Sequence, residues 1–150
     1  MSETIDILIH VSEEECAQAK QAEDQRANIT NLIIIIASAI QGGLTQTGLT
    51  RSALPLTITL ILLGIFGAVA VEKLYEHFQR HIQSDKQIRK RLEELYPDTQ
   101  LKTLSTIARE TNRAKHPRWI QPIPLHIIWV SLHSFIAILG LIYTIIALLH

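Results

Sequence analysis

Charge is missing from long stretches of this 150-residue chain. Between Ala27 and Val71 the only charged residue is Arg51, and from Pro122 to His150 there is none. The overall hydrophobic fraction of 47% is ordinary, but the apolar residues are concentrated in blocks that the charged residues avoid. The length leaves room for one domain. These blocks therefore exclude an ordinary soluble domain and indicate a membrane protein.

Cysteine is nearly absent as well. Cys16 is the only one, so no intrachain disulfide can form, and we expect a half-buried thiol in a reducing compartment. No cleavable signal peptide is expected, because the first apolar run begins near residue 29 and follows an acidic segment. His77 and His81 share a helix face at metal-ligand spacing but have no Cys partner, which favours surface histidines. The sequence therefore predicts no metal site and no cofactor.

Three apolar runs are long enough for transmembrane helices. Leu32–Ile40, taken together with Thr45–Leu49, reaches the roughly 20 residues that a helix needs to cross the hydrocarbon core. Leu54–Val71 contains 18 consecutive uncharged residues, and His126–Leu149 is the third run. Because lipid offers no water to backbone polar groups, each run must be helical.

The basic residues predict the orientation of the chain. Of the 14 Lys and Arg residues, 11 lie between Glu72 and Gln121. Basic residues next to spans stay on the cytoplasmic side. We therefore expect the N-terminus and residues 72–121 in the cytoplasm, the short turn at 42–53 outside, and the C-terminus outside. The expected location is a bacterial inner membrane.

The predicted fold is an all-α integral membrane protein with three transmembrane helices and a cytoplasmic helical hairpin between the second and the third. A cytoplasmic N-terminal segment covers 1–28, a transmembrane hairpin 29–71, the cytoplasmic hairpin 72–121 and the third transmembrane helix 122–150. The apolar surface of the cytoplasmic hairpin is thin for the entropy cost of ordering it. We therefore expect an oligomer, with the lipid bilayer, further copies and a soluble cytoplasmic protein as partners; nucleic acid is not expected.

Local patterns set the expected boundaries. Residues 4–11 alternate between apolar and polar types, which suggests a short strand, with a helical turn lying on the membrane left open. Ser12 and Glu15 match a capping box, so a helix is expected from about Glu13 to Gln41 or beyond. The turn is expected from Gly42 to Ser52.

The second predicted helix continues well past its transmembrane part. Past Val71, no Gly or Pro interrupts the chain until Pro97, so a helix continuous from Pro55 would contain about 42 residues. The segment at 97–99 is expected to end this helix and to cap a second one. Gly64 and Ala68 form a small-xxx-small pair that suits close helix packing, within the chain or between copies.

The first transmembrane helix carries a stripe of polar residues. These residues, named the polar stripe below, are Asn31, Ser38, Gln41 and Thr45. Asn31, Ser38 and Thr45 are spaced seven residues apart, and Gln41 falls on the same side of the helix. Polar side chains in a membrane face neighbouring helices or water. The stripe indicates either hydrogen bonds between helices or the lining of a pore. A pore requires self-association, because three helices are too few to enclose water.

Two histidines occupy one face of the third transmembrane helix. His126 is expected at the membrane interface, and His133 lies about two turns deeper, where an ionisable group is costly. We expect His133 to pair with a neighbouring helix, with Asn31 or another polar-stripe residue as partner, or to respond to pH.

Arg109 and His116 are seven residues apart in a basic segment and share a helix face. An Arg that stabilises a phosphate and a His that transfers a proton are suited to cleaving RNA. The same basic segment also suits contact with anionic headgroups or with a partner.

A helix entering a tight transmembrane hairpin, a following cytoplasmic hairpin, and the Arg109/His116 pair together resemble small membrane effectors of prokaryotic immune systems. These include the SLATT proteins and the RipA-type and CRISPR-associated membrane accessory proteins. The resemblance covers residues 12–116 by architecture, while the third span departs from the two-span SLATT plan. It implies oligomerisation, membrane permeabilisation and growth arrest on infection.

Three hypotheses follow from these observations. The first is a non-enzymatic, oligomeric effector that forms a pore lined by the polar stripe and is gated through its cytoplasmic helices. The second is a membrane-tethered ribonuclease that uses Arg109 and His116. The third is a passive membrane anchor or assembly subunit for a soluble partner.

Overall fold

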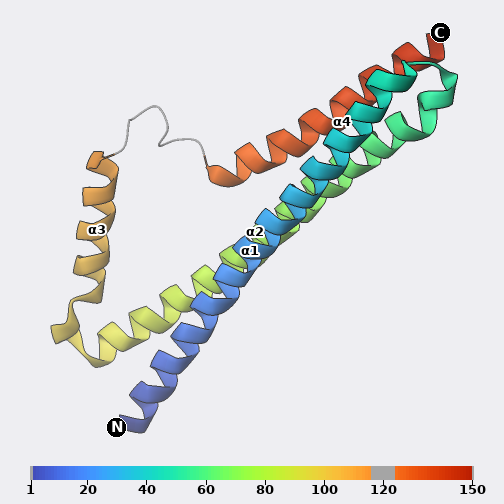
Figure 1. The fold of residues 1–150 in the computed structure, drawn as a ribbon. Helices are drawn as coiled ribbons and strands as arrows, with labels where there is room; N and C mark the ends of the chain where they lie inside the picture. The colour runs from blue at the N-terminus through green and yellow to red at the C-terminus, as the bar shows by residue number, and fades with distance from the viewer. Residues whose placement is uncertain (1, 116–123, 150) are drawn as a thin grey trace. The chain divides into compact units, whose positions relative to one another are not determined.

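The structure is a computed structural model that describes residues 2–115 and 124–149. Its helices are α1 (Ser2–Thr47), α2 (Leu54–Leu95), α3 (Leu101–Lys115) and α4 (Leu125–Leu149). Short 3-10 helices, η1 (Arg51–Ala53) and η2 (Pro97–Thr99), precede α2 and α3, and no strand occurs among the described residues (Figure 1).

Three segments are long and apolar enough to cross a membrane: Glu3–Thr47, Arg51–Leu95 and Leu125–Leu149. Large apolar side chains such as Ile35, Leu62 and Phe135 are more than 60% exposed along them. Exposed apolar surface on this scale favours contact with lipid over contact with water. The fold is therefore helical and suited to a membrane, as the sequence predicts.

The chain forms two compact units. The first combines the N-terminal part of α1, up to Glu23, with the chain from Glu76 to Pro124. The second combines Asp24–Tyr75 with α4. The second unit holds the apolar runs, and the first holds most of the charged residues.

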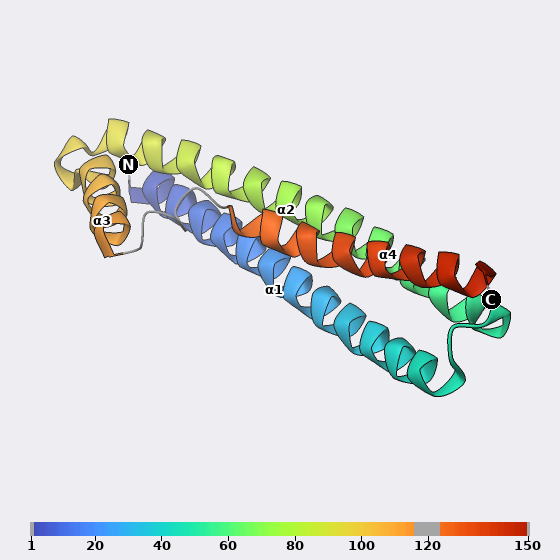
Figure 2. The same cartoon turned by 90° about the horizontal axis from the view of Figure 1, so that it is seen from above.

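In the second unit, α1, α2 and α4 pack side by side (Figures 1 and 2). Small residues let α2 and α4 approach closely. A Cβ on Gly64 would lie 2.7 Å from the Cα of Ala137, and one on Gly140 would lie 2.8 Å from the backbone nitrogen of Ile61. The Gly64 and Ala68 pair therefore includes a contact within the chain. The buried core is formed by Ile33, Ala37, Ile40, Leu44, Ala53, Leu60 and Ile136.

The predicted strand at 4–11 is wrong, because these residues form the first turns of α1. Ile5 and Leu8 are half-buried, and the inward positions continue at a helical spacing to the buried Ala19 and Ala22. The apparent alternation came from isoleucines on the exposed side of this helix. The helix also begins earlier than Glu13, so the predicted capping box is wrong as well.

The turn after α1 is shorter than expected. Gly42 and Gly43 remain helical, and α1 ends where Gly48 adopts a left-handed conformation with φ +73°. The prediction for the second helix is confirmed: α2 contains 42 residues and ends before Pro97. Helix α3 then follows, as the sequence predicts.

Candidate functional site

Polar side chains lie on both the buried and the exposed faces of the second unit. Thr30 on α1 and His133 on α4 are fully buried, and the Thr30 hydroxyl lies 3.1 Å from Nε2 of His133. Gly67 on α2 gives the ring its space, because a Cβ there would lie 2.7 Å from Cγ of His133. This histidine therefore joins three helices, and its partner is Thr30, one residue before Asn31.

A second buried hydrogen bond ties α2 to α4 farther along. The Thr144 hydroxyl donates to the hydroxyl of Thr57, which is fully buried, at 2.9 Å. It also lies 2.8 Å from the backbone carbonyl of Gly140 in its own helix. Hydrogen bonds between membrane helices stabilise their packing, because lipid offers no alternative partner. These threonines could not be singled out from the sequence, where both are ordinary members of apolar runs.

The polar stripe occupies a different face of α1 from the packed one. Asn31, Ser38 and Thr45 are exposed, and Gln41 is half-buried. Thr45 bonds to the carbonyl of Gly42 in its own helix, and no stripe residue bonds to another helix within the described residues. The stripe therefore remains available to a molecule outside the chain.

His126 lies in an aromatic cluster at the start of α4. Its ring stacks on Tyr75 of α2 with centroids 4.0 Å apart, while the Arg26 guanidinium lies 5.7 Å from the ring centroid of Trp129. Arg26 is buried, so the ring contact accompanies a desolvated cation. Tyrosine and tryptophan are typical of membrane interfaces. This arrangement suits the interfacial position expected for His126.

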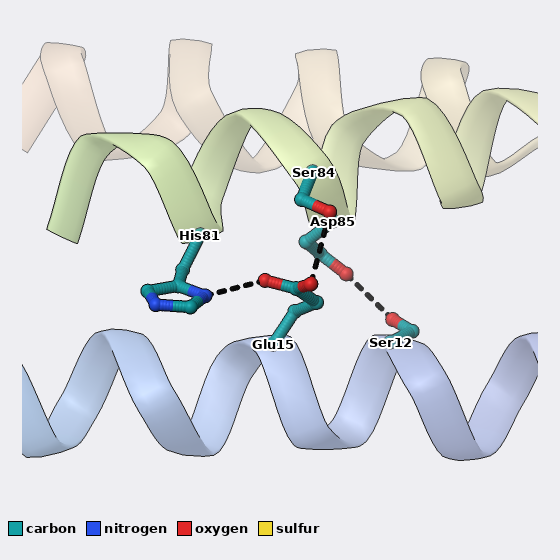
Figure 3. A network of polar contacts seen from close by, with 5 residues as sticks. All are labelled: Ser12, Glu15, His81, Ser84 and Asp85. Atoms are coloured by element: carbon teal, nitrogen blue, oxygen red, sulfur yellow. Dashed lines mark hydrogen bonds and ion pairs between the residues drawn. The ribbon is translucent and has the colours of Figure 1, made fainter. Parts of the chain in front are cut away.

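In the first unit, a polar cluster joins α1 to α2 (Figure 3). We call it the Glu15 cluster. The carboxylate of Glu15 accepts hydrogen bonds from Nδ1 of His81 at 2.6 Å and from the hydroxyl of Ser84 at 3.0 Å. The hydroxyl of Ser12 donates to the buried Asp85 at 2.5 Å. The members of the cluster are Ser12, Glu15, His81, Ser84 and Asp85.

Hydrogen bonding shifts two pKa values in this region. The bonds from His81, the larger effect, and from Ser84 lower the pKa of Glu15. The carboxylate of Asp85 accepts from Nε of Arg89 at 2.7 Å and raises the pKa of that guanidinium. The ionised forms of Glu15 and Arg89 are thus favoured in the folded unit.

The structure describes only one residue of the predicted RNA-cleaving pair. Arg109 lies exposed on α3, whereas His116 falls outside the described residues. No cluster of three or more metal-ligating side chains occurs among the residues that the structure describes. His77 and His81 instead contact each other edge to face, with ring centroids 4.5 Å apart.

Comparisons of the chain with protein-family models, curated proteins and solved structures found no match.

Proposed function

We propose that several copies of this chain assemble in a bacterial inner membrane and permeabilise it. The exposed polar stripe of α1 carries this proposal. Asn31, Ser38 and Thr45 occur on a helix apolar enough to span a membrane, on an exposed face where they bond to no other helix that the structure describes. Polar groups facing acyl chains are costly, so neighbouring copies or water are the favourable surroundings.

The assembly would act as an effector in anti-phage defence, as the resemblance to small immune membrane proteins implies. The unit that includes α3 would face the cytoplasm and receive the gating signal, directly or through a soluble partner. The concentration of 11 of the 14 Lys and Arg residues between Glu72 and Gln121 is the property that favours this orientation. The N-terminus would then also be cytoplasmic, and the C-terminus would lie outside.

Ion flux from liposomes tests the pore. The variant carrying Asn31→Leu and Gln41→Leu should reduce flux at least tenfold, because the path would lose two polar side chains. Thr59→Leu is the matched control: Thr59 is exposed on α2 and bonds only to the carbonyl of Pro55 in its own helix. Its flux should stay within twofold of the unchanged protein.

Two results would contradict the proposal. One is flux that the double variant leaves unchanged, since the stripe would then serve only as helix contact. The other is a monomeric mass in detergent, measured by light scattering, because one chain has too few helices to enclose water. An absence of flux from every variant, including the unchanged chain, would instead favour a passive membrane anchor.

A further inference from the structure

A groove lies between the C-terminal part of α2 and α3, within the first unit. Its volume is about 980 Å³, and both helices line it. We call it the basic groove, because its walls carry five basic side chains. These are Lys86, Arg89, Lys90, Lys102 and Arg109.

The two carboxylates in the groove are already engaged. Glu94 accepts a hydrogen bond from Arg91 at 3.0 Å. Glu93 accepts one from the backbone nitrogen of Lys102 at 3.3 Å. Neither carboxylate is paired with a basic side chain across the groove. The positive charge of the groove walls is therefore not neutralised by these two carboxylates.

Four of the basic side chains lack an ionic partner. Arg89 is bound to Asp85, but Lys86, Lys90, Lys102 and Arg109 form no ion pair with any residue that the structure describes. Lys86 and Lys90 belong to α2 and Arg109 belongs to α3, so like charges converge from both walls. Such convergence is unfavourable in isolation and becomes favourable when an anion lies between the walls.

The connection between the helices holds the two walls in place. The hydroxyl of Thr99 donates to the carbonyl of Tyr96 at 2.8 Å, and Gln100 adopts a left-handed conformation with φ 48°. The bond from Lys102 to Glu93 adds a direct link between α3 and α2. The turn and this link therefore help to fix the position of α3 against α2, and with it the shape of the groove.

We propose that the basic groove binds a phosphate-bearing anion. Lysine and arginine side chains from two directions can contact phosphate oxygens through charge-assisted hydrogen bonds. The volume falls within the range of small-ligand sites, roughly 300–1,000 Å³. Leu101 and Leu104 add apolar surface for the remainder of the ligand. A soluble nucleotide and an anionic lipid headgroup both present this chemistry, and the site does not depend on pore formation.

Binding of ATP to the full chain in neutral detergent tests the soluble source. The double variant Lys90→Glu with Arg109→Glu should weaken binding at least tenfold, and the neutral pair Lys90→Gln with Arg109→Gln should weaken it less. The matched control reverses two exposed basic residues outside the groove, Lys20→Glu and Arg80→Glu. This control has the same net charge and should bind within twofold of the unchanged chain. Circular dichroism confirms that the variants remain helical.

Native mass spectrometry with added phosphatidylglycerol or phosphatidylcholine tests the lipid source. Selective retention of phosphatidylglycerol that the groove variant loses, with no ATP binding, would assign the site to a headgroup. Saturable ATP binding that the groove variant loses would assign it to a soluble ligand. The proposal is overturned if the unchanged chain binds neither probe, or if the control variant loses binding as strongly as the groove variant.

Discussion

The imidazole of His133 and the hydroxyl of Thr30 lie 3.1 Å apart, and neither side chain is exposed. Gly67 lies against the same ring, so α1, α2 and α4 meet at one side chain. An ionisable residue in a membrane helix is ordinarily a functional candidate. Here its position gives it a structural role in joining the three helices.

Replacing Thr30 by valine should destabilise the second unit. The change keeps the shape of the side chain but leaves Nε2 of His133 without its partner, at a cost of about 0.5–1.5 kcal/mol. Thermal unfolding in detergent, followed by circular dichroism, measures the effect. Thr59→Val is the control, because Thr59 is exposed and bonds only within α2. Equal melting temperatures for both variants would show that the interhelical bond contributes nothing.

Replacing Gly64 by alanine should force α4 away from α2. The added Cβ would lie 2.7 Å from the Cα of Ala137, and backbone atoms cannot yield as a flexible side chain does. The expected destabilisation is about 1–3 kcal/mol. At Gly42 an added Cβ meets nothing within 4 Å, so Gly42→Ala should be neutral or slightly stabilising. If the two variants unfold at the same temperature, the close helix contact is not present.

The stability of the first unit should depend on the ionisation of Glu15. Hydrogen bonds from His81 and Ser84 lower its pKa below the ordinary 4.5. A carboxyl whose pKa is lowered on folding stabilises the folded state fully above its unfolded pKa, and this contribution disappears as the pH falls through the folded pKa.

Glu15→Gln should therefore lower the melting temperature at pH 7 and leave it less sensitive to acid below pH 4.5 than in the unchanged chain. Glu14→Gln is the matched control, because Glu14 is the exposed neighbour of Glu15. Melting curves between pH 7 and pH 3.5 measure the difference. Identical acid sensitivity in the two variants would contradict the role of the Glu15 cluster.

The proposed orientation is testable because the chain has a single cysteine. In a Cys16→Ser background, Thr50→Cys places a thiol in the exposed turn after α1, and Glu13→Cys places one on the exposed side of the first unit. A membrane-impermeant maleimide should label residue 50 in intact cells and residue 13 only after permeabilisation. The reverse pattern would invert the proposed orientation.

Much of the helical framework could be predicted from the sequence. Uninterrupted apolar runs define three long helices, and the absence of Gly and Pro between Val71 and Pro97 allows α2 to continue to Leu95. These are local properties of the chain. Helix α1 ends at the left-handed Gly48 and not at Gly42 or Gly43. This could not be predicted, because a helix end depends on the backbone conformation of a few residues, which composition does not reveal.

The hydrogen-bond partners of a side chain could not be predicted from the sequence where two sets of partners were possible. Ser12 and Glu15 have the spacing of a capping box, but in the structure they bond to Asp85 and to His81 on another helix. Only the packing of α1 against α2 decides between these uses. The same reason applies to His133, whose partner depends on the relative height of α1 and α4 and not on its own sequence neighbourhood.

The glycine contacts between α2 and α4 have a mechanical consequence. Gly64 and Gly67 on α2 leave room for the backbone of Ala137 and the ring of His133, and Gly140 on α4 leaves room for the backbone of Ile61. Sliding or rotating either helix would make atoms overlap at these contacts. Rearrangements inside this pair are therefore disfavoured. In the assembly proposed above, motion that opens or closes a passage would have to displace whole three-helix units against one another.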